Sequence, residues 1–160
     1  MSWKGKTIGE KTLARWNLLS RFPGGKWIFS KIVGRTAPYS GSIGARILDM
    51  KPGLVHVGLR DRKAVRNHLN SIHAIALANL GEIASGLAVI CSLPPNVRGI
   101  VTNIQIEYKK KARGYLIAEG RASVSQINGD TDLQVSAEIK DQDSDIVAIV
   151  TVDWRLGVIE

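Results

Sequence analysis

The sequence predicts an α+β fold in which a curved antiparallel sheet of five or six strands wraps around one long central helix. Two observations predict this arrangement. Residues 72–92 are apolar apart from a few polar side chains, of which Glu82 is the only acidic one. After this segment, apolar and polar residues alternate in four stretches, which is typical of strands with one buried face. Such a sheet needs a cover, and a helix that is apolar nearly all round provides one.

The start of the chain is predicted to form two short helices. Apolar residues recur at three-residue spacing over residues 10–22, which favours an amphipathic helix. A Pro-Gly-Gly run ends it, and residues 26–33 form a second helix that Gly34 terminates. We therefore divide the chain into a basic N-terminal helical segment at 1–38 and a sheet-and-helix domain at 39–160.

Two strands are predicted before the central helix and four after it. The first two, at 44–50 and 54–59, flank a Lys-Pro-Gly turn. Asn128-Gly129 and residues 141–145 lie where hairpin turns belong, and the basic residues at 109–113 are expected at another turn. The four later strands are predicted at 104–109, 114–126, 133–140 and 146–154.

Positive charge is concentrated near the N-terminus. The net charge is +8, and residues 1–66 carry 14 Lys and Arg against 3 Asp and Glu. Such an excess suits nucleic acid, an anionic membrane surface or a phosphorylated ligand. Nucleic acid is not expected, because the sequence contains no known binding module. Trp3, Trp16 and Trp27 alternate with basic residues, which suits weak membrane contact unless these helices pack on the body of the protein.

Several classes of site are not expected. A single cysteine, Cys91, excludes an internal disulfide, and its apolar surroundings favour a packing role. The three histidines lack clustered cysteines or carboxylates at ligand spacing, so no metal site is predicted. No apolar run reaches the length of a membrane span and no signal core is recognised, so a cytoplasmic location is expected.

Glu82 lies in a notch on the predicted helix. On a 100° helical wheel, Ile75, Asn79 and Gly86 cluster around Glu82, with Ser85 at the edge. A carboxylate in a mainly apolar notch has a raised pKa, which suits a base or nucleophile working near neutral pH. The alternative is a structural glutamate held by a backbone or arginine partner, because an unpaired buried carboxylate is costly.

The spacing around Glu82 resembles that of a known enzyme family. Asn67 precedes His73 by six residues, and Glu82 follows His73 by nine. This pattern resembles the hotdog-fold thioesterases of the phenylacetate-degradation and hydroxybenzoyl-CoA type, and the resemblance covers roughly residues 40–155. The sequence His-Ala, where those thioesterases read His-Gly-Gly, looks like the branch that carries the uncharacterised DUF4442 domain.

The resemblance implies roles for four residues. Glu82 would attack the thioester carbonyl or activate the water that does so. The backbone N–H of Ala74 would donate to the oxyanion at the helix N-terminus. His73 would orient the start of the helix around this N–H, unless it only caps the helix. Asn67 would lie near the attacking water, unless it is an ordinary loop residue. Ile75 departs from the family, because it places a branched side chain where the thioesterases keep glycine.

The resemblance also implies a ligand and an assembly. Coenzyme A would be part of the substrate, with no separate cofactor, and its phosphates would meet Lys111 and Arg113 unless this basic turn is merely solvated. Asn79, Ser85 and Gly86 would line the substrate site. The family forms pockets between subunits, so a homodimer or a dimer of dimers is expected.

Two functions follow as alternatives. The first is hydrolysis of an acyl-CoA or acyl-carrier thioester, with Glu82 as base or nucleophile. The second is binding of an acyl group or lipid without turnover, which the branched side chain of Ile75 favours. A protein of this second kind could also contact a membrane surface.

Overall fold

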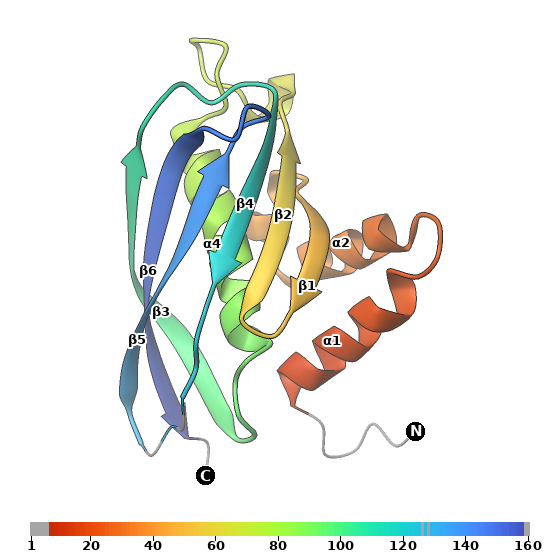
Figure 1. Ribbon diagram of the computed structural model, residues 1–160, viewed down its shortest axis with the longest axis vertical. Coiled ribbons are helices and arrows are strands. Elements are labelled where there is room, and N and C mark those ends of the chain that lie inside the picture. Colours follow the sequence, from red (N-terminus) through yellow and green to blue (C-terminus); the bar gives the residue numbers. More distant parts are fainter. Residues whose placement is uncertain (1–6, 126, 128, 159–160) are drawn as a thin grey trace.

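The computed structural model describes residues 7–125, 127 and 129–158, so Trp3 and the predicted turn residue Asn128 lie outside the described residues (Figure 1). A six-stranded antiparallel sheet curves around helix α4, with three shorter helices at one side of the molecule. The predicted fold class is therefore confirmed. The elements are α1 Ile8–Leu19, α2 Gly25–Thr36, α3 Pro38–Ser42, β1 Arg46–Lys51, β2 Leu54–Arg60, a 3-10 turn Lys63–Val65, α4 Ala74–Ile90, β3 Val97–Tyr108, β4 Tyr115–Arg121, β5 Thr131–Lys140 and β6 Ile146–Val158.

The strand order corrects one expectation. The sheet runs β1-β2-β4-β5-β6-β3, so β3 pairs with β6 at an edge and not with β4. The basic residues 109–113 therefore do join two strands of the sheet, but these are edge strand β3 and interior strand β4, which are not neighbours, so this connection is not a hairpin. Alternation along one strand reveals its buried face but not its partner, which depends on the backbone hydrogen bonds of the whole sheet. The hairpin expected at 141–145 does join neighbouring strands, β5 and β6.

Small residues let α4 approach the sheet closely. A Cβ atom built on Gly120 of β4 would lie 2.2 Å from the backbone of Ala84, so this position admits no side chain unless the helix moves away. Leu80, Ala84 and Ala88 of α4 are fully buried against the sheet. The segment predicted as an apolar helix is therefore buried along most of its length, as its composition indicates.

The central helix begins later than predicted, at Ala74 rather than residue 72. The N–H of Ile72 donates to the carbonyl of Ala112, and the N–H of His73 donates to that of Val65, each at 2.8 Å. These bonds hold both residues outside the helix. His73 has an extended backbone and is the N-cap residue.

The N-terminal helices pack on the body of the protein. Trp16 of α1 is buried and contacts Phe29 of α2 edge-on, with ring centroids 5.2 Å apart. The second helix continues through Gly34 to Thr36, so the prediction that Gly34 ends it is wrong. Gly34 instead permits close contact with α3, since it has no side chain. A Cβ atom on Gly41 of α3 would lie 2.4 Å from the carbonyl oxygen of Gly34.

Candidate active site

Glu82 lies in the middle of α4 beside an aromatic ring. Its side chain is partly buried, and no described residue forms a hydrogen bond or ion pair with its carboxylate. A Cβ atom built on Gly86 would lie 3.4 Å from Oε1 of Glu82 and 3.4 Å from Cζ2 of Trp154. The carboxylate and the indole therefore both lie beside Gly86, where a larger side chain would contact each of them.

The surroundings of Glu82 change its acidity. Burial raises the pKa of Glu82 above its ordinary value, because the apolar environment disfavours the charged form. No ion pair with a described residue opposes this effect, so the structural glutamate considered from the sequence has no observed partner among the residues described. A carboxyl group that is easily protonated and only partly covered suits proton transfer near neutral pH.

A cavity of about 380 Å³ opens at this carboxylate. We call it the Glu82 pocket. Its walls come from α1, α2 and α4, with Ser40 of α3, and most of the lining side chains are apolar. Lys11 and Arg15 are contributed by α1. The lining residues include Ile8, Phe29, Ile32, Val33, Ile83, Gly86, Leu87 and Ile90.

Sequence reasoning did not find the contribution of α1 and α2 to this site. The apolar side of each helix was visible in the sequence, but the same pattern serves a helix that only covers the core. In the structure these helices both cover the core and enclose the Glu82 pocket.

The first residue of α4, Ala74, has a backbone N–H that donates to no other described residue. Nδ1 of His73 accepts a hydrogen bond from the N–H of Ile75 at 3.1 Å, so His73 caps the helix. The N–H of Ala74 donates to no described residue, while its carbonyl accepts from the hydroxyl of Tyr108 at 3.2 Å. A free N–H at the positive end of the helix dipole is suited to an oxyanion. Ile75 is 54% exposed next to it.

The two parts of the expected site lie apart within one chain. Glu82 lies eight positions after Ala74, and a rise of about 1.5 Å per residue places them about 12 Å apart along the helix. A donor and a base that act on one thioester must both lie within hydrogen-bonding distance of it. Glu82 and the N–H of Ala74 of the same chain therefore cannot serve one carbonyl group.

Asn67, Asn79 and Ser85 do not meet at the Glu82 pocket. Oδ1 of Asn67 accepts from the N–H groups of Leu69 and Ser71, at 2.9 and 3.1 Å, and so shapes its own loop. Asn79 and His73 line a different cavity of about 270 Å³. Ser85 is fully buried, and its hydroxyl donates to a helix carbonyl. Of the residues expected to contact substrate, only Gly86 lies at the Glu82 pocket.

Lys111 and Arg113 lie near the N-terminus of α4. They flank Ala112, whose carbonyl accepts from the N–H of Ile72 just before the helix. The two preceding lysines are engaged, since Lys109 pairs with Glu107 and Lys110 pairs with Asp141 and Asp145.

The described residues offer neither a metal-binding cluster nor a membrane-spanning helix. Within the described ranges, no group of three or more His, Cys, Asp or Glu side chains is arranged to hold a metal ion. In the same part of the chain, no helix is both long and apolar enough to cross a membrane.

The chain is similar to one protein family and to several solved structures. The model of a family described as a domain of unknown function, DUF4442, matches residues 25–156. No sequence among curated proteins matches the chain. A structural-genomics crystal structure is 28% identical, with a TM-score of 0.79, and the alignment covers 92% of this chain and 97% of that one.

Two other solved structures have similar folds at lower identity. One is a Pseudomonas aeruginosa protein of unknown function described as a probable thioesterase, with 20% identity, a TM-score of 0.71 and coverage of 78% and 90%. The other is a hypothetical thioesterase from Streptococcus pneumoniae solved with coenzyme A, with 24% identity, a TM-score of 0.61 and coverage of 72% and 91%. At these identities the likeness establishes a shared fold, in agreement with the hotdog fold expected from the sequence.

Proposed function

The chain belongs to the DUF4442 family, and from this premise we propose that it hydrolyses an acyl-CoA thioester with Glu82 as the general base or nucleophile. The observation that carries the proposal is a partly buried carboxylate without an ion-pair partner among the described residues, facing an apolar pocket. The names of structural neighbours support it, since several are called thioesterases and one was solved with coenzyme A.

The proposed mechanism uses three features of the chain. The acyl chain occupies the Glu82 pocket, whose lining is mainly apolar. As general base, Glu82 takes a proton from the attacking water and passes it to the departing sulfur as the C–S bond breaks, which releases the acid and the thiol. As nucleophile, Glu82 attacks the thioester carbon, the C–S bond breaks and the thiolate takes a proton from water; a second water then hydrolyses the acyl-glutamyl anhydride and restores the carboxylate. The developing oxyanion accepts a hydrogen bond from the N–H of Ala74 at the N-terminus of α4. Burial of Glu82 raises its pKa, which makes it a stronger base than an exposed glutamate.

Because Ala74 and Glu82 of one chain lie about 12 Å apart along α4, the proposed mechanism requires a second copy of the chain. In the proposed dimer, Glu82 of one subunit and the Ala74 N–H of the other act on the same thioester. Two surfaces support this arrangement. Edge strand β3 exposes Ile100 and Ile104, and the side of α4 around Ile75 is not covered by the sheet. An exposed edge strand with apolar side chains is a ready site for pairing with another strand.

The second candidate function is binding without turnover. It is favoured by Ile75, whose exposed side chain stands beside the N–H of Ala74 and narrows the approach to it. The Glu82 pocket would then hold an acyl chain, and the carboxylate would contribute only polarity.

Release of free thiol from a panel of acyl-CoAs separates these functions. We expect the purified protein to release coenzyme A from at least one medium- or long-chain substrate, because the pocket is mainly apolar. Turnover that is absent across the panel, together with saturable binding of the same acyl-CoAs, would reject hydrolysis in favour of the binding function.

The oligomeric state gives a second test, for which we predict a dimer that pairs through β3. Ile104→Lys places a charge on the exposed edge strand and is expected to yield monomers in sedimentation equilibrium. Ile117→Lys is the matched control, because Ile117 is also exposed but lies on interior strand β4, and this variant should remain dimeric. A wild-type protein that stays monomeric at micromolar concentration would contradict the proposed shared site.

A further inference from the structure

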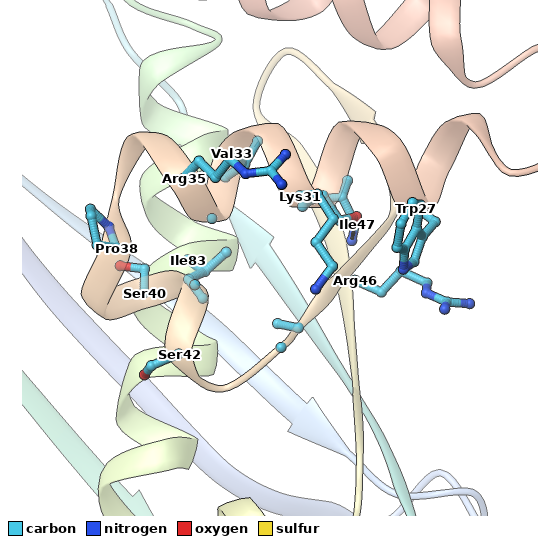
Figure 2. Close-up of a pocket in the computed structure, with 15 residues that line it drawn as sticks. Trp27, Lys31, Val33, Arg35, Pro38, Ser40, Ser42, Arg46, Ile47 and Ile83 are labelled. Atoms are coloured by element: carbon cyan, nitrogen blue, oxygen red, sulfur yellow. Dashed lines mark hydrogen bonds between the residues drawn. The ribbon is translucent and has the colours of Figure 1, made fainter.

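A second cavity lies beside the Glu82 pocket, between α2 and the start of β1. Its volume is about 370 Å³, and Figure 2 shows its lining from α2, the α3 turn and β1, with Ile83 of α4. We call it the α2–β1 pocket. Val33, Ser40 and Ile83 line both cavities, so the two pockets adjoin at these side chains.

The α2–β1 pocket is lined by three basic side chains and by no acidic one. Lys31 and Arg35 come from α2 and Arg46 from the first position of β1 (Figure 2). None of the three forms an ion pair with a described residue. The ammonium group of Lys31 lies over the ring of Trp27, 5.8 Å from its centroid, which is compatible with a fixed positive charge. The pocket therefore carries positive charge that no described acidic side chain balances by a direct ion pair.

Helix stability accounts for only part of this cluster, because Arg35 complements the dipole in the last turn of α2 but Lys31 and Arg46 do not. Lys31 and Arg35 stand four residues apart on α2, where two like charges repel each other. Arg46 adds a third positive charge from the neighbouring strand. An anion in the pocket would relieve this repulsion.

The arginine and lysine side chains of the α2–β1 pocket favour phosphate as the anion that it binds. The guanidinium group of arginine matches phosphate through paired hydrogen bonds, and lysine adds a mobile ammonium donor. Three positive groups around one cavity suit a group with more than one negative charge. A single carboxylate would leave most of this positive charge unbalanced.

We propose that the α2–β1 pocket binds a phosphate group at the polar end of a ligand whose apolar chain occupies the Glu82 pocket. The adjoining walls at Val33, Ser40 and Ile83 connect the two ends of such a ligand. The inference rests on the proposed function only for naming that ligand an acyl thioester. It places the phosphate on the N-terminal helices, away from Lys111 and Arg113. Coenzyme A and a phospholipid headgroup share this chemistry.

The test measures binding of decanoyl-CoA by titration calorimetry, in a Glu82→Gln background so that turnover does not interfere. Lys31→Ala, Arg35→Ala and Arg46→Ala are combined in one pocket variant. We expect its affinity to fall at least about tenfold, because a hydrogen bond to a charged group is worth that much. Its affinity for S-decanoyl-N-acetylcysteamine, which has the same chain and thioester but no phosphate, should not change.

A control variant removes the same number of positive charges elsewhere. Lys51→Ala, Arg60→Ala and Lys63→Ala are exposed positions that line neither cavity, and this variant should bind decanoyl-CoA as the parent does. If wild-type protein hydrolyses nothing while the pocket variant alone loses decanoyl-CoA binding, the proposed activity fails and the phosphate site stands.

A vesicle assay distinguishes the two sources of phosphate. Co-sedimentation with phosphatidylglycerol vesicles that is lost in the pocket variant, with decanoyl-CoA binding unchanged, assigns the site to a lipid headgroup. Equal behaviour of the pocket and control variants toward both decanoyl-CoA and these vesicles overturns the inference, whatever the hydrolysis assay gives. A loss of decanoyl-CoA affinity only in Lys111→Ala/Arg113→Ala overturns it as well.

Discussion

Glu82→Gln is expected to lower thioester hydrolysis by about 10²–10⁴-fold, the range for loss of a general base. Glutamine keeps the shape of the side chain and can still form hydrogen bonds, but it neither accepts the proton of water nor attacks a carbonyl. The expected readout is a fall in kcat in the thiol-release assay with little change in KM, because binding of the acyl chain does not use the carboxylate.

The same substitution should leave the melting temperature level or higher at neutral pH. Burial raises the folded-state pKa of Glu82 above its unfolded value, so this group favours the folded state most at low pH. That contribution is lost as the pH rises through the raised pKa, because the ionised carboxylate is poorly solvated. Glutamine has no charge to bury and avoids this loss.

The raised pKa of Glu82 also determines the pH below which the rate of hydrolysis falls. Activity that needs ionised Glu82 should decline as the pH falls through a value above that of an exposed glutamate. Glu138→Gln, on a half-exposed position of β5 where the carboxylate pairs with Lys140, is the control and should change neither rate nor profile. A large loss of stability in Glu82→Gln with unchanged turnover would remove Glu82 from the mechanism and mark it as structural.

Ala74→Pro is expected to lower kcat by about 10²–10³-fold, the cost of removing one oxyanion donor. Proline lacks the backbone N–H that Ala74 leaves free, yet it is well tolerated at the first position of a helix. The preceding residue, His73, has φ −64° and ψ 141°, a backbone conformation that is compatible with a following proline. The variant should therefore fold normally and lose rate.

Ala74→Gly provides the control for this prediction, because glycine keeps the N–H. It should retain most of the activity and lose no more than about 1 kcal/mol of helix stability. Circular dichroism and thermal melting establish that both variants fold. Full activity in a folded Ala74→Pro protein would show that the N–H of Ala74 is not the oxyanion donor.

The fold was predictable from the sequence because its main signals are local. The apolar length of α4 and the alternation of β5 and β6 each specify an element without reference to the rest of the chain. The pairing of β3 with β6 was not predictable, because it depends on contacts far apart in the sequence. The late start of α4 at Ala74 depends likewise on the long-range bond between Ile72 and Ala112.

The candidate site was only partly predictable. Glu82 stood out because one acidic residue in a long apolar helix is a local anomaly. The interest in Ala74 and His73 came from the resemblance to the thioesterases, and the capping by His73 had been only an alternative to the role that this resemblance implies. Packing of α1 and α2 decides where the Glu82 pocket lies, and the basic residues Lys31, Arg35 and Arg46 come together only when α2 lies over β1.

The shared site is tested most directly by subunit complementation. Glu82→Gln and Ala74→Pro chains are co-expressed with different affinity tags, and heterodimers are purified through both tags. In the proposed dimer, one of the two sites then combines an intact Glu82 with an intact Ala74 N–H, so hydrolysis should return to about half of the wild-type rate. Heterodimers as inactive as the two parent variants would contradict a site built from both subunits.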